Sequence, residues 1–185
     1  MFSKKSLSWG LLALVLTLSG GCQPRLLPAV PAGLTLQPGR YLKEDYRAPG
    51  FVADQVTYTL APFTVAQAQN IPADTFQSLL QAELARAWEA NGLKVAPQGD
   101  VVLVGTVQLV RVNKGLRFLV GRISADLLVS GAITRGEQVL FAFQDRIHVA
   151  SPVNPGPPAP KENELLLQQV IRNFSDHLLT ELLLH

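Results

Sequence analysis

The chain has 185 residues, enough for one domain with a sizeable hydrophobic core and short for two. Its formal net charge of +2 comes from Lys4 and Lys5, because the rest of the chain has 14 basic and 14 acidic residues. This balance excludes the strongly basic surface typical of nucleic-acid-binding proteins. Cys22 is the only cysteine, which excludes an internal disulfide, a CxxC redox motif and a cysteine-rich zinc site.

The N-terminus has the three-part order of a secretory signal. Lys4 and Lys5 form a cationic start, the apolar run Leu7–Leu18 follows, and Ser19, Gly20 and Gly21 lead directly to Cys22. The apolar run is too short for a comfortable membrane span. We therefore predict that residues 1–21 are a signal peptide.

The ending Gly20-Gly21-Cys22 resembles the lipobox of bacterial lipoproteins. The resemblance implies that residues 1–21 form a lipoprotein signal peptide and that Cys22 becomes the acylated first residue. Gln23, rather than Asp, follows the cysteine, which by the same resemblance implies an outer-membrane anchor with the domain facing the periplasm. Several acyl chains together give stable anchoring. The alternative is an ordinary signal peptide followed by a chance cysteine.

Residues 22–50 are rich in proline and glycine and show no sustained helical or strand period. This composition is typical of an extended, semi-rigid tether. Within it, Gly39–Tyr46 is expected to dock on the domain, since Tyr41, Leu42 and Tyr46 offer apolar surface for burial. The domain itself is expected to span residues 51–185.

The first part of the domain reads as a strand followed by a helix. Val56–Phe63 is rich in β-branched and aromatic residues, which predicts the strand. Asp74 and Gln77 resemble a capping box, and apolar residues then recur at three- and four-residue spacing up to Asn91-Gly92. The helix is expected to end there, with Gly92 just past its last turn.

The second part reads as strands followed by a closing helix. Alternating apolar residues predict half-buried strands, and Arg135-Gly136-Glu137 predicts a tight hairpin between the last two. A proline-rich surface loop over 151–160 separates them from an amphipathic helix. In chain order the predicted elements are a short edge strand over Leu93–Ala96, strands over Val101–Val112, Ile123–Thr134 and Gln138–Val149, and a helix over Glu162–His185.

The element order is therefore β-α-β-β-β-β-α. This order predicts an α+β two-layer sandwich: a mainly antiparallel, four- to five-stranded sheet with two helices on one face.

The sequence contains little that indicates a catalytic activity. No nucleophile elbow, phosphate-binding loop, dinucleotide fingerprint or zinc-protease motif occurs, and the three histidines have no metal-ligand spacing. We expect no catalytic site, no metal and no cofactor. The least favoured alternative is an envelope hydrolase that uses Asp126, Asp145 and His148 from adjacent strands.

The segment between two predicted strands, residues 111–122, mixes basic and apolar residues. Such a connection can hold a partner protein, glycan phosphates or lipid head groups, or it can be a structural loop whose apolar residues pack under the helices. The candidate partner-binding residues are Arg111, Lys114, Arg117, Phe118, Leu119 and Arg122.

The same region also carries a family resemblance. The exit Gly92-Leu93-Lys94-Val95, the strand DVVLVGTV (Asp100–Val107) and RFLVG (Arg117–Gly121) before an alternating strand resemble small bacterial envelope lipoproteins known only as domains of unknown function. The strand and helix plan is also loosely similar to periplasmic lipoproteins that activate peptidoglycan synthases or form secretion assemblies. The resemblance implies no catalytic residues.

Together these features predict a non-enzymatic, membrane-anchored lipoprotein. It is expected to be a binding or accessory module of an envelope assembly or transport system, with an envelope protein as partner and no nucleic acid. The main alternative is a structural lipoprotein that self-assembles into a homo-oligomer, a ring or a coat, through sheet edges or the RFLVG segment.

Overall fold

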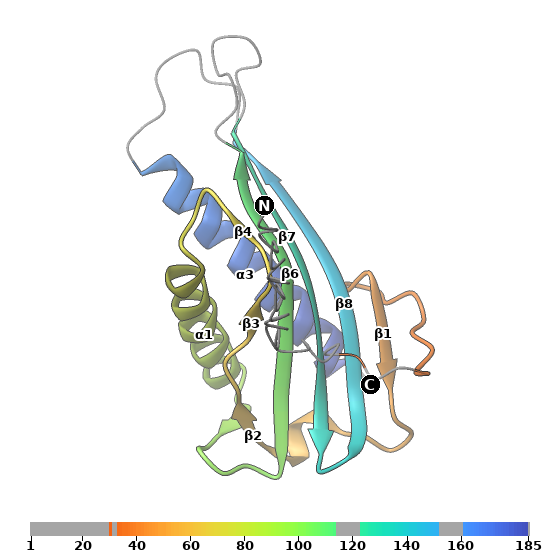
Figure 1. Ribbon diagram of the computed structural model, residues 1–185. Helices are drawn as coiled ribbons and strands as arrows, with labels where there is room; N and C mark the ends of the chain where they lie inside the picture. The colour runs from red at the N-terminus through yellow and green to blue at the C-terminus, as the bar shows by residue number, and fades with distance from the viewer. Residues whose placement is uncertain (1–29, 31–32, 114–122, 152–160, 185) are drawn as a thin grey trace, which may run out of the picture.

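The computed structural model describes residues 30, 33–113, 123–151 and 161–184. Its centre is a sheet of eight strands (Figure 1), ordered β1-β8-β7-β6-β2-β5 with β3 and β4 also paired to β6. Two helices, α1 (Ala73–Ala90) and α3 (Glu162–Leu183), cover one face of this sheet. The strands are β1 (Glu44–Arg47), β2 (Thr57–Leu60), β3 (Thr64–Val65), β4 (Ala68–Gln69), β5 (Lys94–Val95), β6 (Val101–Asn113), β7 (Ser124–Arg135) and β8 (Gln138–Ala150).

The α+β class and the two-layer plan are confirmed, but the predicted sheet was wrong in strand count and direction. β6, β7 and β8 form an antiparallel meander, and β1 pairs antiparallel with β8. β2, β3 and β4 instead pair parallel with β6, and β5 pairs parallel with β2. The sheet is therefore mixed, since the β2–α1–β6 crossover returns the chain in the same direction.

The segment Gly39–Tyr46 docks on the domain, as expected. Leu42 is buried, and β1 adds a strand to the edge of β8. The sheet thus begins before Phe51, where the sequence placed the start of the domain. An ordered 3₁₀ turn, Ala53–Gln55, connects this segment to β2.

Helix α1 ends as predicted but begins differently. Asn91 is its last cap and Gly92 adopts a positive φ of 75°, the conformation that glycine allows without strain. At the other end the N-cap is Pro72, so Asp74 lies inside the first turn and the capping box does not form. The Gln77 amide instead donates to the backbone oxygen of Phe63, 2.7 Å away, and ties the helix to the sheet.

Aromatic rings fill the space between the sheet and the helices. The Phe174 ring of α3 lies 6.3 Å from the Phe63 ring and 5.9 Å from the Phe143 ring, centre to centre. Gly105 and Gly131 lie opposite each other on β6 and β7, and a Cβ on either would meet the Phe63 or Phe143 ring at less than 3 Å. Glycine at these two positions makes room for the rings.

The other face of the sheet carries no helix among the described elements (Figure 1). Half-buried side chains from β6 and β7 form it, including Val104, Leu109 and Leu128. We call this surface the open face. No helix in the described part of the chain is both long and apolar enough to cross a membrane.

Candidate functional site

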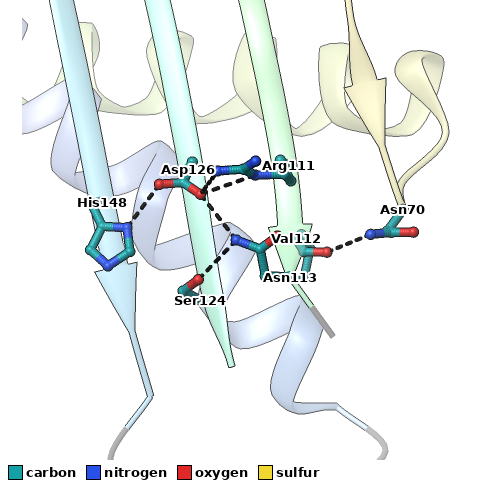
Figure 2. A network of polar contacts seen from close by, with 7 residues as sticks. All are labelled: Asn70, Arg111, Val112, Asn113, Ser124, Asp126 and His148. Carbon is teal, nitrogen blue, oxygen red and sulfur yellow. Dashed lines mark hydrogen bonds and ion pairs between the residues drawn. The ribbon is translucent and has the colours of Figure 1, made fainter. Parts of the chain in front are cut away.

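A network of polar side chains occupies one end of the open face, where β6 and β8 end and β7 begins (Figure 2). Its centre is Asp126 of β7, only 8% exposed. Arg111 of β6 lies opposite Asp126 on one side, and His148 of β8 lies opposite it on the other. We call this set the Asp126 network; its described members are Asn70, Arg111, Asn113, Ser124, Asp126 and His148.

Both oxygens of the Asp126 carboxylate accept hydrogen bonds. Oδ1 is 2.8 Å from His148 Nδ1, and Oδ2 is 2.9 Å from an Arg111 terminal nitrogen and 3.2 Å from Asn113 Nδ2. Asn113 also contacts Ser124 Oγ at 3.1 Å. Burial alone raises the pKa of Asp126, but the His148 and Arg111 hydrogen bonds outweigh it and hold the pKa below its ordinary value. The carboxylate is therefore ionised, and each of its oxygens is hydrogen-bonded.

The edge of the network is fixed through an unusual backbone position. Asn70, which follows β4, has a positive φ of 64°, a region that asparagine tolerates better than most residues. Its side-chain amide donates to the backbone oxygen of Val112 at 2.8 Å. This bond holds the end of β6 beside the short strand β4.

Two β-bulges produce the alignment of Arg111, Asp126 and His148. The register between β6 and β7 shifts between Val107 and Leu109, so Gln108 is an extra residue on β6. The register between β7 and β8 shifts at Ile133 and Thr134, where Leu140 is extra on β8. Without these residues Asp126 would face the apolar side chains of Val110 and Ile147. Bulges commonly redirect side chains in this way beside functional sites.

The network presents the Arg111 guanidinium and the His148 ring to solvent around a buried anion. The His148 side chain is 58% exposed and that of Arg111 is 39% exposed. Figure 2 shows the second ring nitrogen of His148 pointing away from Asp126. Arg146 lies on the same face of β8, two residues before His148, and is also exposed. The site is therefore suited to bind an anionic or hydrogen-bonding group.

The third residue of the hydrolase hypothesis lies elsewhere. Asp145 is 3% exposed and faces the helices, where its Oδ2 is 3.0 Å from His177 Nδ1 of α3. It is three rows from Asp126 along the strands, about 10 Å, and on the opposite face of the sheet. The expected three-residue arrangement is not formed. Among the described residues there is also no group of three metal-ligating side chains.

The other sequence-predicted site residues cannot be compared in this way. Cys22, Lys114, Arg117, Phe118, Leu119 and Arg122 lie outside the described residues. Arg111 is the one candidate partner-binding residue within the described part of the chain, and it belongs to the Asp126 network.

A second polar cluster fastens the segment before β1 and was missed by the sequence analysis. Glu181 Oε2 accepts the backbone N–H groups of Tyr41 and Leu42, at 2.5 and 3.1 Å. The Arg47 guanidinium donates to the last carbonyls of α3, those of Glu181 and Leu182, at 2.7 and 2.8 Å. The available signal was spacing: His177 and Glu181 follow Val170 and Phe174 at helical intervals, so they share the buried face.

Comparisons with known proteins bear on the fold. No protein-family model matches the chain, and no curated protein matches it in sequence. A solved structure from Xanthomonas campestris, described by the family model DUF330, aligns with a TM-score of 0.56 at 13% identity, over 74% of this chain and 90% of that one.

Two further structures align with lower scores. A minor lipoprotein from Acinetobacter baumannii gives 0.47 at 17% identity, over 71% of this chain and 91% of that one. PelC from Paraburkholderia phytofirmans, a dodecamer, gives 0.43 at 12% identity, over 78% and 98%. The Xanthomonas structure shows a shared fold, so the resemblance to a family known only as a domain of unknown function is confirmed at that level.

Proposed function

We propose that this chain is a non-enzymatic lipoprotein of the bacterial outer membrane whose periplasmic domain binds another component of the envelope. The N-terminal sequence supports the anchor, with acylated Cys22 at the start of the tether. The observation that supports the binding role is the Asp126 network at the end of the open face. In this proposal the chain is an accessory module of an envelope assembly or transport system.

The geometry favours binding over acid–base catalysis. A general base needs a free lone pair within hydrogen-bond reach of the proton that it takes. The Asp126 carboxylate already accepts bonds from Arg111, Asn113 and His148, and the Arg111 and His148 bonds hold its pKa below the ordinary value, which makes it a weak base. The Arg111 and His148 side chains remain accessible to solvent as hydrogen-bond donors, and the buried Asp126 carboxylate holds them in place.

The segment that joins Asn113 of β6 to Ile123 starts and ends beside the Asp126 network. Its basic and apolar residues are therefore connected to the same end of the sheet. We propose that the segment and the network together form one partner-binding surface. Its residues are Arg111, Lys114, Arg117, Phe118, Leu119 and Arg122.

Site-specific photo-crosslinking in intact cells tests the binding role. A photoreactive residue is placed in the full-length anchored chain at Leu128 or Val104 on the open face, with Gln168 or Arg172 on the helix layer as matched controls. We expect one discrete adduct from the open face and none from the helices. Adducts from the helix layer alone would contradict the proposal, and an adduct of twice the chain mass would favour self-assembly.

Two substitutions test the other parts of the proposal. Alanine at Phe118 and Leu119 should weaken the crosslink without changing the melting temperature. A lower melting temperature with an unchanged crosslink would assign both residues to the core instead. Cys22→Ser should move the chain from the membrane fraction to the soluble periplasmic fraction, because the acyl chains provide the anchor.

A further inference from the structure

Strand β8 has an incompletely paired edge. β7 pairs with it along its whole length, whereas β1 on the other side pairs only with Phe141–Gln144. In Figure 1 no other described strand lies beside β8 beyond the end of β1. The last part of β8, Asp145–Ala150, is therefore a sheet edge within the described structure; we call it the β8 edge.

The direction of the backbone groups along this edge follows from the neighbouring hydrogen bonds. Asp45 of β1 exchanges both backbone bonds with Gln37, on the side away from β8. Its neighbours Glu44 and Tyr46 therefore point toward β8, opposite Gln144 and Ala142. By the same alternation, the backbone groups that face outward farther along are those of Arg146, His148 and Ala150.

One side chain ends the β1 ladder and leaves the remaining groups exposed. Asp145 Oδ1 accepts the N–H of Arg146 at 2.8 Å and the N–H of Lys43 at 3.2 Å, so β1 turns away at this point. Beyond it, the carbonyl of Arg146, both backbone groups of His148 and the N–H of Ala150 have no partner among the described residues. Such groups can pair with an added strand.

The basic side chains along the β8 edge determine which strands can pair with it. Arg146 and His148 project from alternate residues onto the open face, and both are exposed. The Arg146 guanidinium forms no ion pair within the described residues. Directly opposite residues on neighbouring strands interact, and opposite charges are favourable. The chain's own strand β1 places an acidic residue, Glu44, opposite Gln144, two residues before Arg146.

The same charges disfavour a second copy of this chain. Two β8 edges paired about a two-fold axis centred on Arg146 place the two guanidinium groups directly opposite each other. Like charges in that position are destabilising. An acidic segment from another protein would instead place carboxylates beside these basic residues, which avoids the repulsion.

We propose that the β8 edge binds an extended, acidic segment of a partner protein by strand addition. The backbone of that segment continues the β1 ladder past Asp145, and its acidic side chains alternate along the open face beside Arg146 and His148. The inference rests on the proposed binding role and names the partner chemistry of that surface.

Labelled peptides test the inference with the full-length lipidated chain in detergent micelles. The probe alternates glutamate with threonine over about six residues, enough to span the edge at about 3.3 Å per residue. One matched peptide has lysine in place of glutamate, and another carries N-methyl groups on alternate residues. We expect the glutamate peptide to bind at least about tenfold more tightly than either, a difference of about 1.4 kcal/mol.

Each control separates one explanation from another. Equal binding of the N-methylated peptide would show charge attraction without strand pairing and overturn the inference, as would equal binding of the lysine peptide. Arg146→Glu should reverse the preference toward lysine, while Arg172→Glu on α3 should leave it unchanged. If crosslinks form at Leu128 in cells but the peptides are not distinguished, the binding role stands and only the edge inference fails.

Discussion

Asp126 and Asp145 are buried carboxylates on neighbouring strands, and each is bound by the Nδ1 atom of a histidine. They differ in their other partners, which are side chains for Asp126 and backbone N–H groups for Asp145. Asp126 faces the open side and is surrounded by side chains: Arg111, Asn113 and His148. Asp145 faces the helices and accepts two backbone N–H groups as well as His177. Asp126 therefore positions side chains of the open face, whereas Asp145 fixes the backbone at Lys43 and Arg146.

The difference determines what each residue contributes to folding. Exposed side chains can return to water when their partner is lost, so the net loss is small. Backbone donors in a packed segment cannot do so without disrupting the fold, and an unsatisfied buried group costs about 1–3 kcal/mol. Stability should therefore depend more on Asp145, and partner binding more on Asp126.

Asp145→Ala should produce the largest effect. It leaves the amides of Lys43 and Arg146 without their acceptor and removes the bond to His177. We expect the free energy of unfolding to fall by about 3 kcal/mol in denaturant titrations of the full-length chain in detergent. Asp145→Asn keeps one side-chain oxygen as an acceptor and should lose less. An alanine variant as stable as the wild type would remove the distinction between the two aspartates.

Asp126→Asn should have a smaller effect that depends on pH. A carboxylate whose pKa is lowered by folding adds stability above its ordinary value of 3.8 and loses it as the pH falls through the lower, folded-state pKa. The wild type should therefore be more stable than the variant by about 1 kcal/mol at pH 7.

Parallel unfolding curves from pH 7 down to the acid range would measure this difference. It should disappear at the acidic end, where the wild-type carboxyl becomes protonated. A difference that grows as the pH falls would contradict the assigned network. The in-cell crosslink at Leu128 should weaken in the same variant, because the donors of the network lose their anchor.

Asp45→Asn should have the smallest effect, and of opposite sign. Burial first and the Glu181 charge second raise the pKa of Asp45, although Arg47 lowers it, so the ionised form is disfavoured in the folded chain. The variant should gain a few tenths of a kcal/mol at pH 7, because solvent screens this half-exposed group. The gain should vanish as the pH falls below the ordinary pKa of 3.8, as measured by unfolding curves; a loss at pH 7 would contradict it.

Much of the fold followed from periodicity. The long strands β6, β7 and β8 and both helices have enough residues for a clear pattern, and their positions were predicted closely. β3 and β4 have two residues each, too few to show a period. β1 has the polar sequence EDYR, and it is a strand because the edge of β8 pairs with it.

The site was harder to predict than the fold because it depends on register. Counting back from the hairpin at Gly136 places Ile147, not His148, opposite Asp126. The extra residue Leu140 changes this pairing, and Gln108 does the same for Arg111 on the other side. Neither bulge has a glycine or proline that would mark it in the sequence. The strands could be predicted, but not which side chains met across them.

The fastening of the segment before β1 also has a mechanical consequence. In a lipid-anchored chain, a pull on the residues before Gln37 would load the two backbone bonds between Gln37 and Asp45 first. The bonds from Tyr41 and Leu42 to Glu181 and the four-residue strand β1 would be loaded next. The open face lies outside this path. Tension strong enough to peel β1 away would free the backbone of Gln144 and Ala142 and lengthen the edge available for pairing.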